Sequence, residues 1–172
     1  MQKLSNMSLS EARFDLKMIE THDEIKWHEW QQKIIDLIAI EPDNRTINWF
    51  WGEKRNNGRR FLKKYLNRKY NVVTSDGSRA SVYKQYNNNL KKEDKRPLIL
   101  LIDICKIDKK YVNYVVMENI KDGSIHSRKG ALHLRPHHLL VFANFPPDET
   151  KLSIDRLNVV RMDIQQLNNQ EQ

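Results

Sequence analysis

The chain has 172 residues, with 30 Lys and Arg against 22 Asp and Glu and a formal net charge of +8. This length suits one domain with a sizeable core, and the basic balance favours polyanionic partners, nucleic acid first and an acidic membrane surface second. The single cysteine, Cys105, excludes an internal disulfide and suits a reducing compartment. No apolar run approaches the ~18 residues of a transmembrane helix, and the N-terminus lacks the apolar core of a signal peptide. The sequence predicts a soluble intracellular protein with no membrane partner.

The first predicted elements are helices, between residues 11 and 40. Apolar residues recur at spacings of three and four from Trp27 to Ile38, which predicts an amphipathic helix that ends before Pro42. The segment Thr21–Glu24 has the form of a capping box for this helix. Its tryptophans are expected to lie in the core or at a subunit contact rather than to bind a ligand.

A strand, a loop and a basic helix follow. Residues 45–51 are β-branched and aromatic, which predicts a strand. Residues 52–58 form a polar loop, and residues 59–70 are predicted to be a helix with a two-turn apolar stripe. Residues 71–74 fit a short strand, and the asparagine-rich and charged residues 87–96 are predicted to be a polar surface loop.

Two apolar runs each end in one polar side chain. Leu98–Ile102 is followed by Asp103, the form of a Walker B motif, in which the acid holds the Mg²⁺ of a nucleotide. Leu139–Ala143 runs into Asn144, and two prolines then end the strand. Because ligands bind at the carboxyl ends of strands in open α/β sheets, we expect these two side chains at the ends of neighbouring parallel strands, facing the loop 52–58. The alternative for Asn144 is a buried strand followed by a surface Pro-Pro turn.

The remaining pattern completes an α/β domain. Residues 109–121 are predicted to be a helix, residues 124–135 a hairpin, and residues 157–162 a last strand. Helices that alternate with strands predict a mostly parallel sheet. The hairpin tip, Arg128 with Lys129, is suited to contact with phosphate, and its alternative is a solvated turn. The basic face of the 59–70 helix is open to the same two interpretations, contact with phosphate or a solvated surface.

Four histidines follow the predicted helix without forming a predicted metal site. Two of them, His137 and His138, are adjacent and would point to opposite faces of a strand. His126 and His133 stand apart from them, and no cysteine pair accompanies the group.

The order of these motifs resembles the superfamily 3 helicases. Residues 140–148, Leu-Val-Phe-Ala-Asn-Phe-Pro-Pro-Asp, look like motif C of that family. The resemblance points to the helicase half of replication-associated (Rep) proteins from small circular single-stranded DNA viruses and their satellites, of nanovirus or alphasatellite type. The other matching segments, in family order, are Trp30-Gln31 with residues 42–49 as lead-in, 52–60 in the Walker A place, 102–104 in the Walker B place, 113–129 in the B′ region, and 152–156 after motif C.

The resemblance implies a fold and an activity. The fold would be a three-layer P-loop NTPase, AAA+-like, over residues 42–163, preceded by a helical segment 1–41 and followed by a disordered tail 164–172. The activity would be ATP- and Mg²⁺-dependent unwinding by a ring-shaped homo-oligomer on single-stranded DNA or RNA, in the host nucleus if the protein is viral. The family's nicking domain is expected to be missing, because the residues before Trp27 are too few to hold it.

The resemblance also implies roles for individual residues. Asp103 would hold Mg²⁺, and Asn144 would sense the γ-phosphate and the attacking water. Lys129 and Arg128 would grip the nucleic-acid strand in the ring. Arg156 would act across a subunit boundary as an arginine finger. A surface ion pair between Asp155 and Arg156 is the alternative.

The Walker A place departs from the family pattern. Nucleotide binding needs Gly-Lys-Ser/Thr after a glycine-rich loop, because the lysine reaches the phosphates and the hydroxyl binds Mg²⁺. Here the place of these cofactor-binding residues is taken by Gly58, Arg59 and Arg60, and Arg55 stands where the family has glycine. A planar guanidinium does not replace a compact ammonium conservatively.

Three functions therefore remain open. The first is an ATP-dependent helicase. The second is a nucleic-acid-binding or ring-assembling subunit that no longer hydrolyses ATP, and the third is a basic protein-interaction module without a nucleotide. The two arginines in the Walker A place favour the second function and predict little or no ATPase activity.

Overall fold

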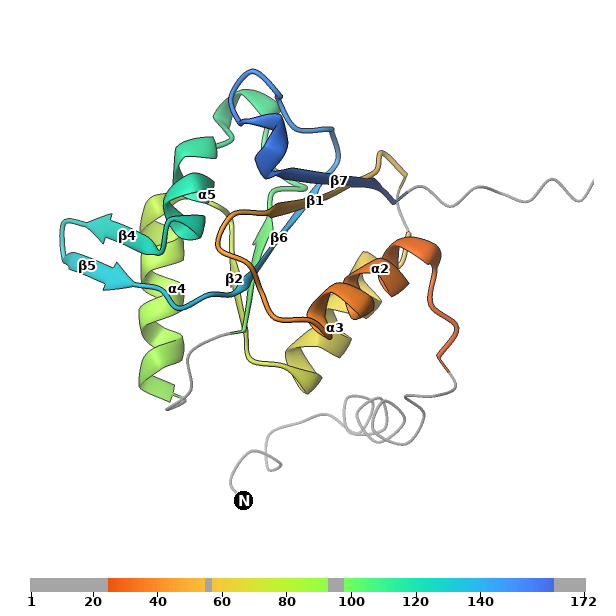
Figure 1. Ribbon diagram of the computed structural model, residues 1–172, viewed down its shortest axis with the longest axis horizontal. Helices are drawn as coiled ribbons and strands as arrows, with labels where there is room; N and C mark the ends of the chain where they lie inside the picture. Colours follow the sequence, from red (N-terminus) through yellow and green to blue (C-terminus); the bar gives the residue numbers. More distant parts are fainter. Residues whose placement is uncertain (1–24, 55–56, 93–97, 163–172) are drawn as a thin grey trace, which may run out of the picture.

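The computed structural model describes residues 25–54, 57–92 and 98–162 (Figure 1). The predicted helical residues before Ile25, including the capping box, lie outside the described residues, as do Arg55 and the tail 164–172. The elements in chain order are α2 (Glu29–Ile38), β1 (Ile47–Trp51), α3 (Arg59–Lys69), β2 (Val72–Ser75), α4 (Arg79–Lys92), β3 (Ile99–Asp103), η2 (Lys109–Tyr111), α5 (Tyr114–Lys121), β4 (Ser124–Ser127), β5 (Gly130–His133), β6 (His138–Ala143), η3 (Ile154–Arg156) and β7 (Leu157–Arg161).

A parallel sheet of five strands forms the centre of the fold. Its order is β2-β3-β6-β1-β7, and every neighbouring pair is parallel. The strand β6 is buried along its whole length, as expected for a central strand that is covered on both faces. The predicted α/β class with a mostly parallel sheet is confirmed, and the arrangement is that of a three-layer, P-loop NTPase-like fold.

Helices cover both faces of the sheet (Figure 1). One core layer joins α2 and α3 to alternate strand residues such as Leu101 and Phe142. The other joins α4 and α5 to the intervening residues, such as Ile102 and Val141. Successive residues of a strand face opposite sides, so Asp103, two residues after Leu101, faces the side covered by α3. None of the helices in the described part of the chain combines the length and apolar composition of a membrane span.

The helix α4 corrects the prediction of a polar loop over 87–96. Asn87, Asn88 and Asn89 lie within the helix, and residues 93–96 are outside the described residues. Val82 and Tyr86, four residues apart, are fully buried and attach the helix to the sheet. The polar composition belongs to the outer part of an amphipathic helix, and two buried side chains were too weak a periodic signal to reveal it.

The predicted helix over 109–121 is divided into two parts. A 3₁₀ turn, η2, precedes α5, which begins after Asn113. The side chain of Asn113 accepts a hydrogen bond of 3.1 Å from the backbone N–H of Val116 and so caps the helix. The hairpin β4–β5 and the last strand β7 form as predicted.

Val141→Ala is expected to lower the free energy of unfolding by roughly 2 kcal/mol, because it leaves a cavity in the fully buried central strand. The matched control is Val115→Ala on α5, where the side chain is 56% exposed and the change is expected to stay within about 0.5 kcal/mol. Urea unfolding of both variants measures the difference. Equal losses in the two variants would contradict the burial of β6.

Candidate functional site

Asp103 and Asn144 end neighbouring parallel strands, as the sequence predicted. β3 pairs with β6 so that Asp103 lies opposite Phe142, two residues before Asn144. The loop after β1 starts at the same edge, because the N–H of Gly52 donates to the carbonyl oxygen of Ala143 at 3.3 Å. A cavity of about 1360 Å³ opens there, lined by Asp103, Asn144 and the first two turns of α3. We refer to it as the carboxyl-edge cavity.

Lys63, on the second turn of α3, forms an ion pair with Asp103 inside this cavity. The lysine Nζ donates to the carboxylate Oδ2, and the two side chains are 30% and 27% exposed. Burial would raise the pKa of Asp103, but the hydrogen bond and charge of Lys63, with the backbone N–H of Cys105, hold that pKa below its ordinary value. Sequence reasoning missed Lys63, although a helix lysine four residues after Arg59, packed over a strand that ends in an acid, was a usable signal.

Arg59 bonds to the residue predicted as the phosphate sensor. Its Nη1 donates to Oδ1 of Asn144 at 2.9 Å and to the carbonyl oxygen of Ala143 at 3.4 Å. The amide nitrogen of Asn144 donates to the carbonyl oxygen of Cys105 at 2.6 Å. Both ends of the Asn144 amide therefore bond within the chain. Burial, with the negative charge of Asp103, raises the pKa of Cys105 to about 12, so this thiol stays protonated.

The residue before Arg59 joins the loop to α2. Gly58 has φ +86°, and a Cβ atom there would lie 2.6 Å from Nε2 of Gln31, so the position requires glycine. The same Nε2 donates to the carbonyl oxygen of Gly58 at 3.1 Å, and Oε1 of Gln31 accepts from the N–H of His28. Arg60 lies at the second position of α3, is exposed and lines the cavity. Trp30, beside Gln31, packs against the sheet as a core residue.

The residues of this cavity fit an anion better than Mg²⁺. Mg²⁺ requires octahedral oxygen ligands, but the carboxylate at the end of β3, Asp103, is paired with Lys63, and position 60 carries a guanidinium in place of a hydroxyl. Within residues 25–54, 57–92 and 98–162, no three His, Cys, Asp or Glu side chains gather as a metal site would need. Arginine and lysine side chains beside a helix N-terminus are instead suited to phosphate.

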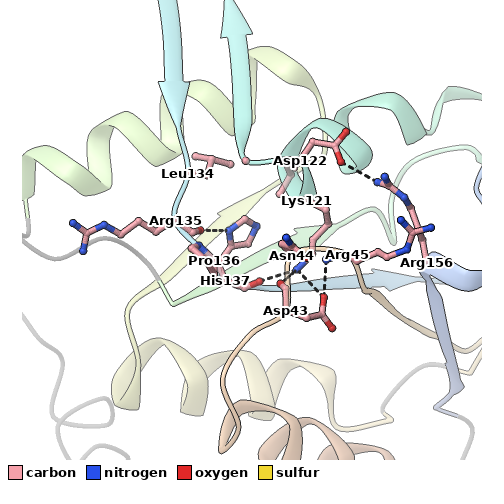
Figure 2. Close-up of a pocket in the computed structure, with 12 residues that line it drawn as sticks. Asp43, Asn44, Arg45, Lys121, Asp122, Leu134, Arg135, Pro136, His137 and Arg156 are labelled. Carbon is pink, nitrogen blue, oxygen red and sulfur yellow. Dashed lines mark hydrogen bonds and ion pairs between the residues drawn. The ribbon is translucent and has the colours of Figure 1, made fainter.

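Arg156 lies at the amino-terminal ends of the strands, opposite the carboxyl-edge cavity. It directly precedes β7, whose first residue pairs with Ile47 at the start of β1. Its Nη1 is 3.2 Å from Oδ1 of Asp122, beside a second cavity of about 470 Å³ (Figure 2). Asp155 forms its ion pair with Arg45 and Arg156 with Asp122, in place of the Asp155–Arg156 pair that was the alternative interpretation. Within one chain, Arg156 does not meet Asp103 or Asn144, and its action on a neighbouring subunit stays a prediction.

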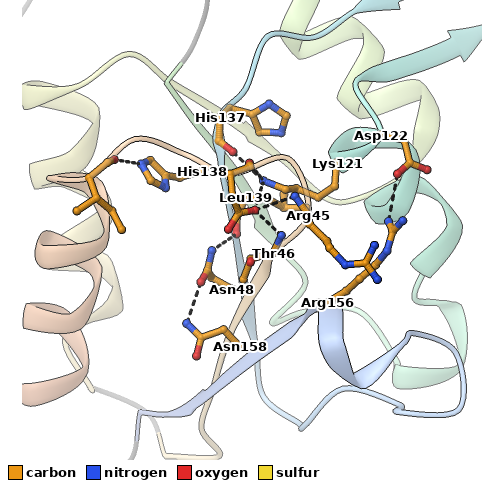
Figure 3. Close-up of polar contacts among 12 residues, drawn as sticks. Arg45, Thr46, Asn48, Lys121, Asp122, His137, His138, Leu139, Arg156 and Asn158 are labelled. Atoms are coloured by element: carbon orange, nitrogen blue, oxygen red, sulfur yellow. Dashed lines mark hydrogen bonds and ion pairs between the residues drawn. The ribbon is translucent and has the colours of Figure 1, made fainter.

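A buried lysine connects two segments that matched the family pattern (Figure 3). Nζ of Lys121 donates to the carbonyl oxygens of Asp43 (2.7 Å) and His137 (3.0 Å) and lies 3.7 Å from the Asp43 carboxylate. Burial lowers the pKa of Lys121, and the charge of Asp43 opposes this shift. The ring of His137 bonds to the carbonyl oxygen of Arg135, and that of His138 to Ile40. Burial lowers the pKa of His137 to about 4, so the ring is neutral.

The hairpin tip lies on the other face of the sheet from α3 (Figure 1). Arg128 and Lys129 connect β4 to β5 and are exposed. The hydroxyl of Tyr83, on α4, donates to the carbonyl oxygen of Lys129 at 3.3 Å and anchors the turn. The structure thus brings the Walker A residues together with Asp103 and Asn144, and places Arg156 and the hairpin tip elsewhere.

The chain is similar in sequence to several Para-Rep proteins of alphasatellites. No family model matches the chain. The chain is similar to Para-Rep C9 of Faba bean necrotic yellows C9 alphasatellite, 30% identical over 137 residues, which are 77% of this chain and 47% of that protein. Para-Rep C6 of Subterranean clover stunt C6 alphasatellite is 30% identical over 142 residues, or 77% and 46% of the two proteins. Para-Rep C3 of Milk vetch dwarf C3 alphasatellite is 29% identical over 168 residues, or 92% and 57%. The chain spans about half the length of the curated relatives it matches.

Lys63→Met is expected to raise the pKa of Asp103, because burial then acts without the ammonium group. In the wild type the lowered pKa contributes stability above the ordinary aspartate pKa, and this contribution is lost as the pH falls through the folded-state value. The variant should reverse the sign and lose stability as the pH rises. Carboxyl NMR titration measures the pKa, and urea unfolding at neutral and acidic pH measures the stability.

The control for this prediction is Lys33→Met on α2. Lys33 lies 2.8 Å from a fully exposed acid, Glu29, so the stability of this variant should depend on pH as in the wild type. An unchanged Asp103 titration in Lys63→Met would contradict the ion pair.

Proposed function

Because the chain is homologous over most of its length to the Para-Rep proteins of alphasatellites, and so belongs to this type of replication-associated (Rep) proteins, we propose that it acts in replication as a nucleic-acid-binding subunit that does not hydrolyse ATP. The observation that carries this proposal is the ion pair of Lys63 with Asp103. In this ion pair the Asp103 carboxylate, on which Mg²⁺-dependent hydrolysis would depend, is already bound to the Lys63 ammonium group.

The loss of hydrolysis follows from three neighbouring groups. Asp103 is neutralised by an ammonium group, and no hydroxyl stands at position 60 to complete a metal site. Asn144 bonds to Arg59, so its amide oxygen is engaged before any nucleotide arrives. Removing one well-placed electrostatic stabiliser commonly lowers a rate by about a hundredfold to a thousandfold, and here several are altered together.

Nucleic-acid binding rests on charge. The net charge of +8 attracts a polyanion, and Arg128 and Lys129 stand exposed at a turn that is anchored to α4. Single-stranded DNA or RNA is the proposed ligand, bound without strong sequence preference. A ring-shaped homo-oligomer and the host nucleus are the assembly and location that go with this proposal.

The purified wild type is expected to hydrolyse ATP in the presence of Mg²⁺ no faster than the Asp103→Asn variant, with or without single-stranded DNA. A phosphate-release assay compares the two proteins, because the substitution removes the carboxylate charge and leaves the shape of the side chain. Hydrolysis that DNA stimulates and that Asp103→Asn abolishes would identify the chain as a working ATP-dependent helicase instead.

Lys129→Ala is expected to weaken binding of a single-stranded oligonucleotide and to reduce the slope of log affinity against log salt by roughly 0.7, the value for one lost phosphate contact. Fluorescence anisotropy at several salt concentrations measures the slope. The control is Lys33→Ala, which removes the same charge from α2 on the other face of the sheet. Equal effects of the two substitutions would remove the hairpin tip from the interface.

A further inference from the structure

The carboxyl-edge cavity carries an excess of positive charge. Two acidic side chains line it, and one of them, Asp103, is already paired with Lys63. The N-terminus of α3, a helix of 11 residues, opens beside it and adds the partial positive charge of the helix dipole. The basic side chains in the lining are Arg59, Arg60, Lys63, Lys64 and Lys106. The charge balance of the lining therefore favours an anion with several negative charges.

A buried donor without an acceptor gives the second and independent indication of a ligand. Asn57 is only 3% exposed and lines the cavity. Its Oδ1 accepts from Nε of Arg59 at 3.1 Å, but its Nδ2 has no hydrogen-bond partner in the described structure. A buried amide N–H without an acceptor is costly, and a phosphate oxygen in the cavity would supply one.

We propose that the carboxyl-edge cavity binds the triphosphate chain of a nucleotide without a metal ion, with the Lys63 ammonium supplying the positive charge that Mg²⁺ supplies in a metal-dependent site. Lys63 is held at the end of β3 by Asp103, so its charge already stands at the cavity wall. Gly58 precedes the first turn of α3, where backbone N–H groups are available to a phosphate, and the unpartnered Nδ2 of Asn57 would donate to the same phosphate. This ligand is distinct from the nucleic acid of the proposed function, which binds at the hairpin tip.

A metal-free site and a metal-dependent site should respond in opposite ways to Mg²⁺ and to the substitution Asp103→Asn. Mg²⁺ should weaken binding, because it neutralises part of the charge on the triphosphate and would have to approach Lys63 and Arg60. Asp103→Asn should strengthen binding in the absence of metal, because it removes the carboxylate charge that is paired with Lys63. In a metal-dependent site, Mg²⁺ strengthens binding and the same substitution weakens it.

The test is calorimetric titration of the full chain with ATP and with inorganic tripolyphosphate, each in EDTA and in excess MgCl₂. We expect both ligands to bind in EDTA and to bind more weakly in MgCl₂. Asp103→Asn should bind more tightly than the wild type in EDTA. Adding Lys63→Ala to that variant should weaken binding by roughly tenfold or more, the usual effect of losing one hydrogen bond to a charged group.

Two controls separate this site from general charge. Lys69→Ala removes a lysine from the exposed end of the same helix, outside the cavity, and should leave the titrations unchanged. Lys129→Ala should change oligonucleotide binding and not ATP binding, so the proposed function and the present proposal can fail separately. Circular dichroism of each variant verifies that it is folded.

Several results would overturn the proposal. They are binding of ATP in MgCl₂ but not in EDTA, loss of binding in Asp103→Asn, and the absence of any binding in EDTA. An oligonucleotide without terminal phosphates that displaces tripolyphosphate, and whose own binding is weakened by Lys63→Ala, would assign the cavity to a nucleic-acid backbone instead.

Discussion

The parallel pairing of β6 with β3 on one side and β1 on the other determines where the strand ends that line the carboxyl-edge cavity lie. Five successive pairs join β3 to β6, and they bring the ends of both strands to one edge. Side chains alternate across the sheet, so Asp103 is turned towards α3 by the same alternation that buries Leu101. The apolar faces that hold the strands together therefore also decide which helix supplies the partner of the acid.

That partner is Lys63, and the pairing has an electrostatic reason. A carboxylate at a largely buried strand end needs a cation, since an unpaired charge in such a place is strongly destabilising. A metal ion is one solution, and a lysine from the covering helix is another. Here the second turn of α3 offers the lysine, while the guanidinium of Arg59 bonds to Asn144, the residue after β6. The Asp103 carboxylate is thus neutralised by the chain, while the lining of the cavity as a whole remains basic.

The sequence predicted the strands well, because each is a short apolar run that ends in a polar residue or a turn. The predicted neighbourhood of Asp103 and Asn144 is confirmed by the pairing of β3 with β6, and the predicted family by homology to alphasatellite proteins. The helix α4 was missed because only Val82 and Tyr86 are fully buried, while Tyr83 and Leu90 are partly buried and the asparagines between them are polar. The spacing of Lys63 from Arg59 was a signal that the prediction did not use, but the contact itself also depends on how α3 rotates over the sheet. The partner of Arg156 could not be predicted, because that contact depends on where loops return, which no local pattern encodes.

Residues that match the family pattern and residues that depart from it have different physical tasks. The indole N–H of Trp49 donates to the carbonyl oxygen of Phe145, and the hydroxyl of Tyr114 accepts from the N–H of Asp148, so both hold the turn after β6. Lys121 holds the lead-in segment in the same way. These groups build the scaffold. The departures at Arg55, Arg59 and Arg60 lie in the loop 52–58 and at the start of α3, the place of the family's Walker A motif. A chain can therefore keep the fold of a nucleotide hydrolase while its phosphate-facing groups change, because the sheet and its supporting hydrogen bonds do not depend on them.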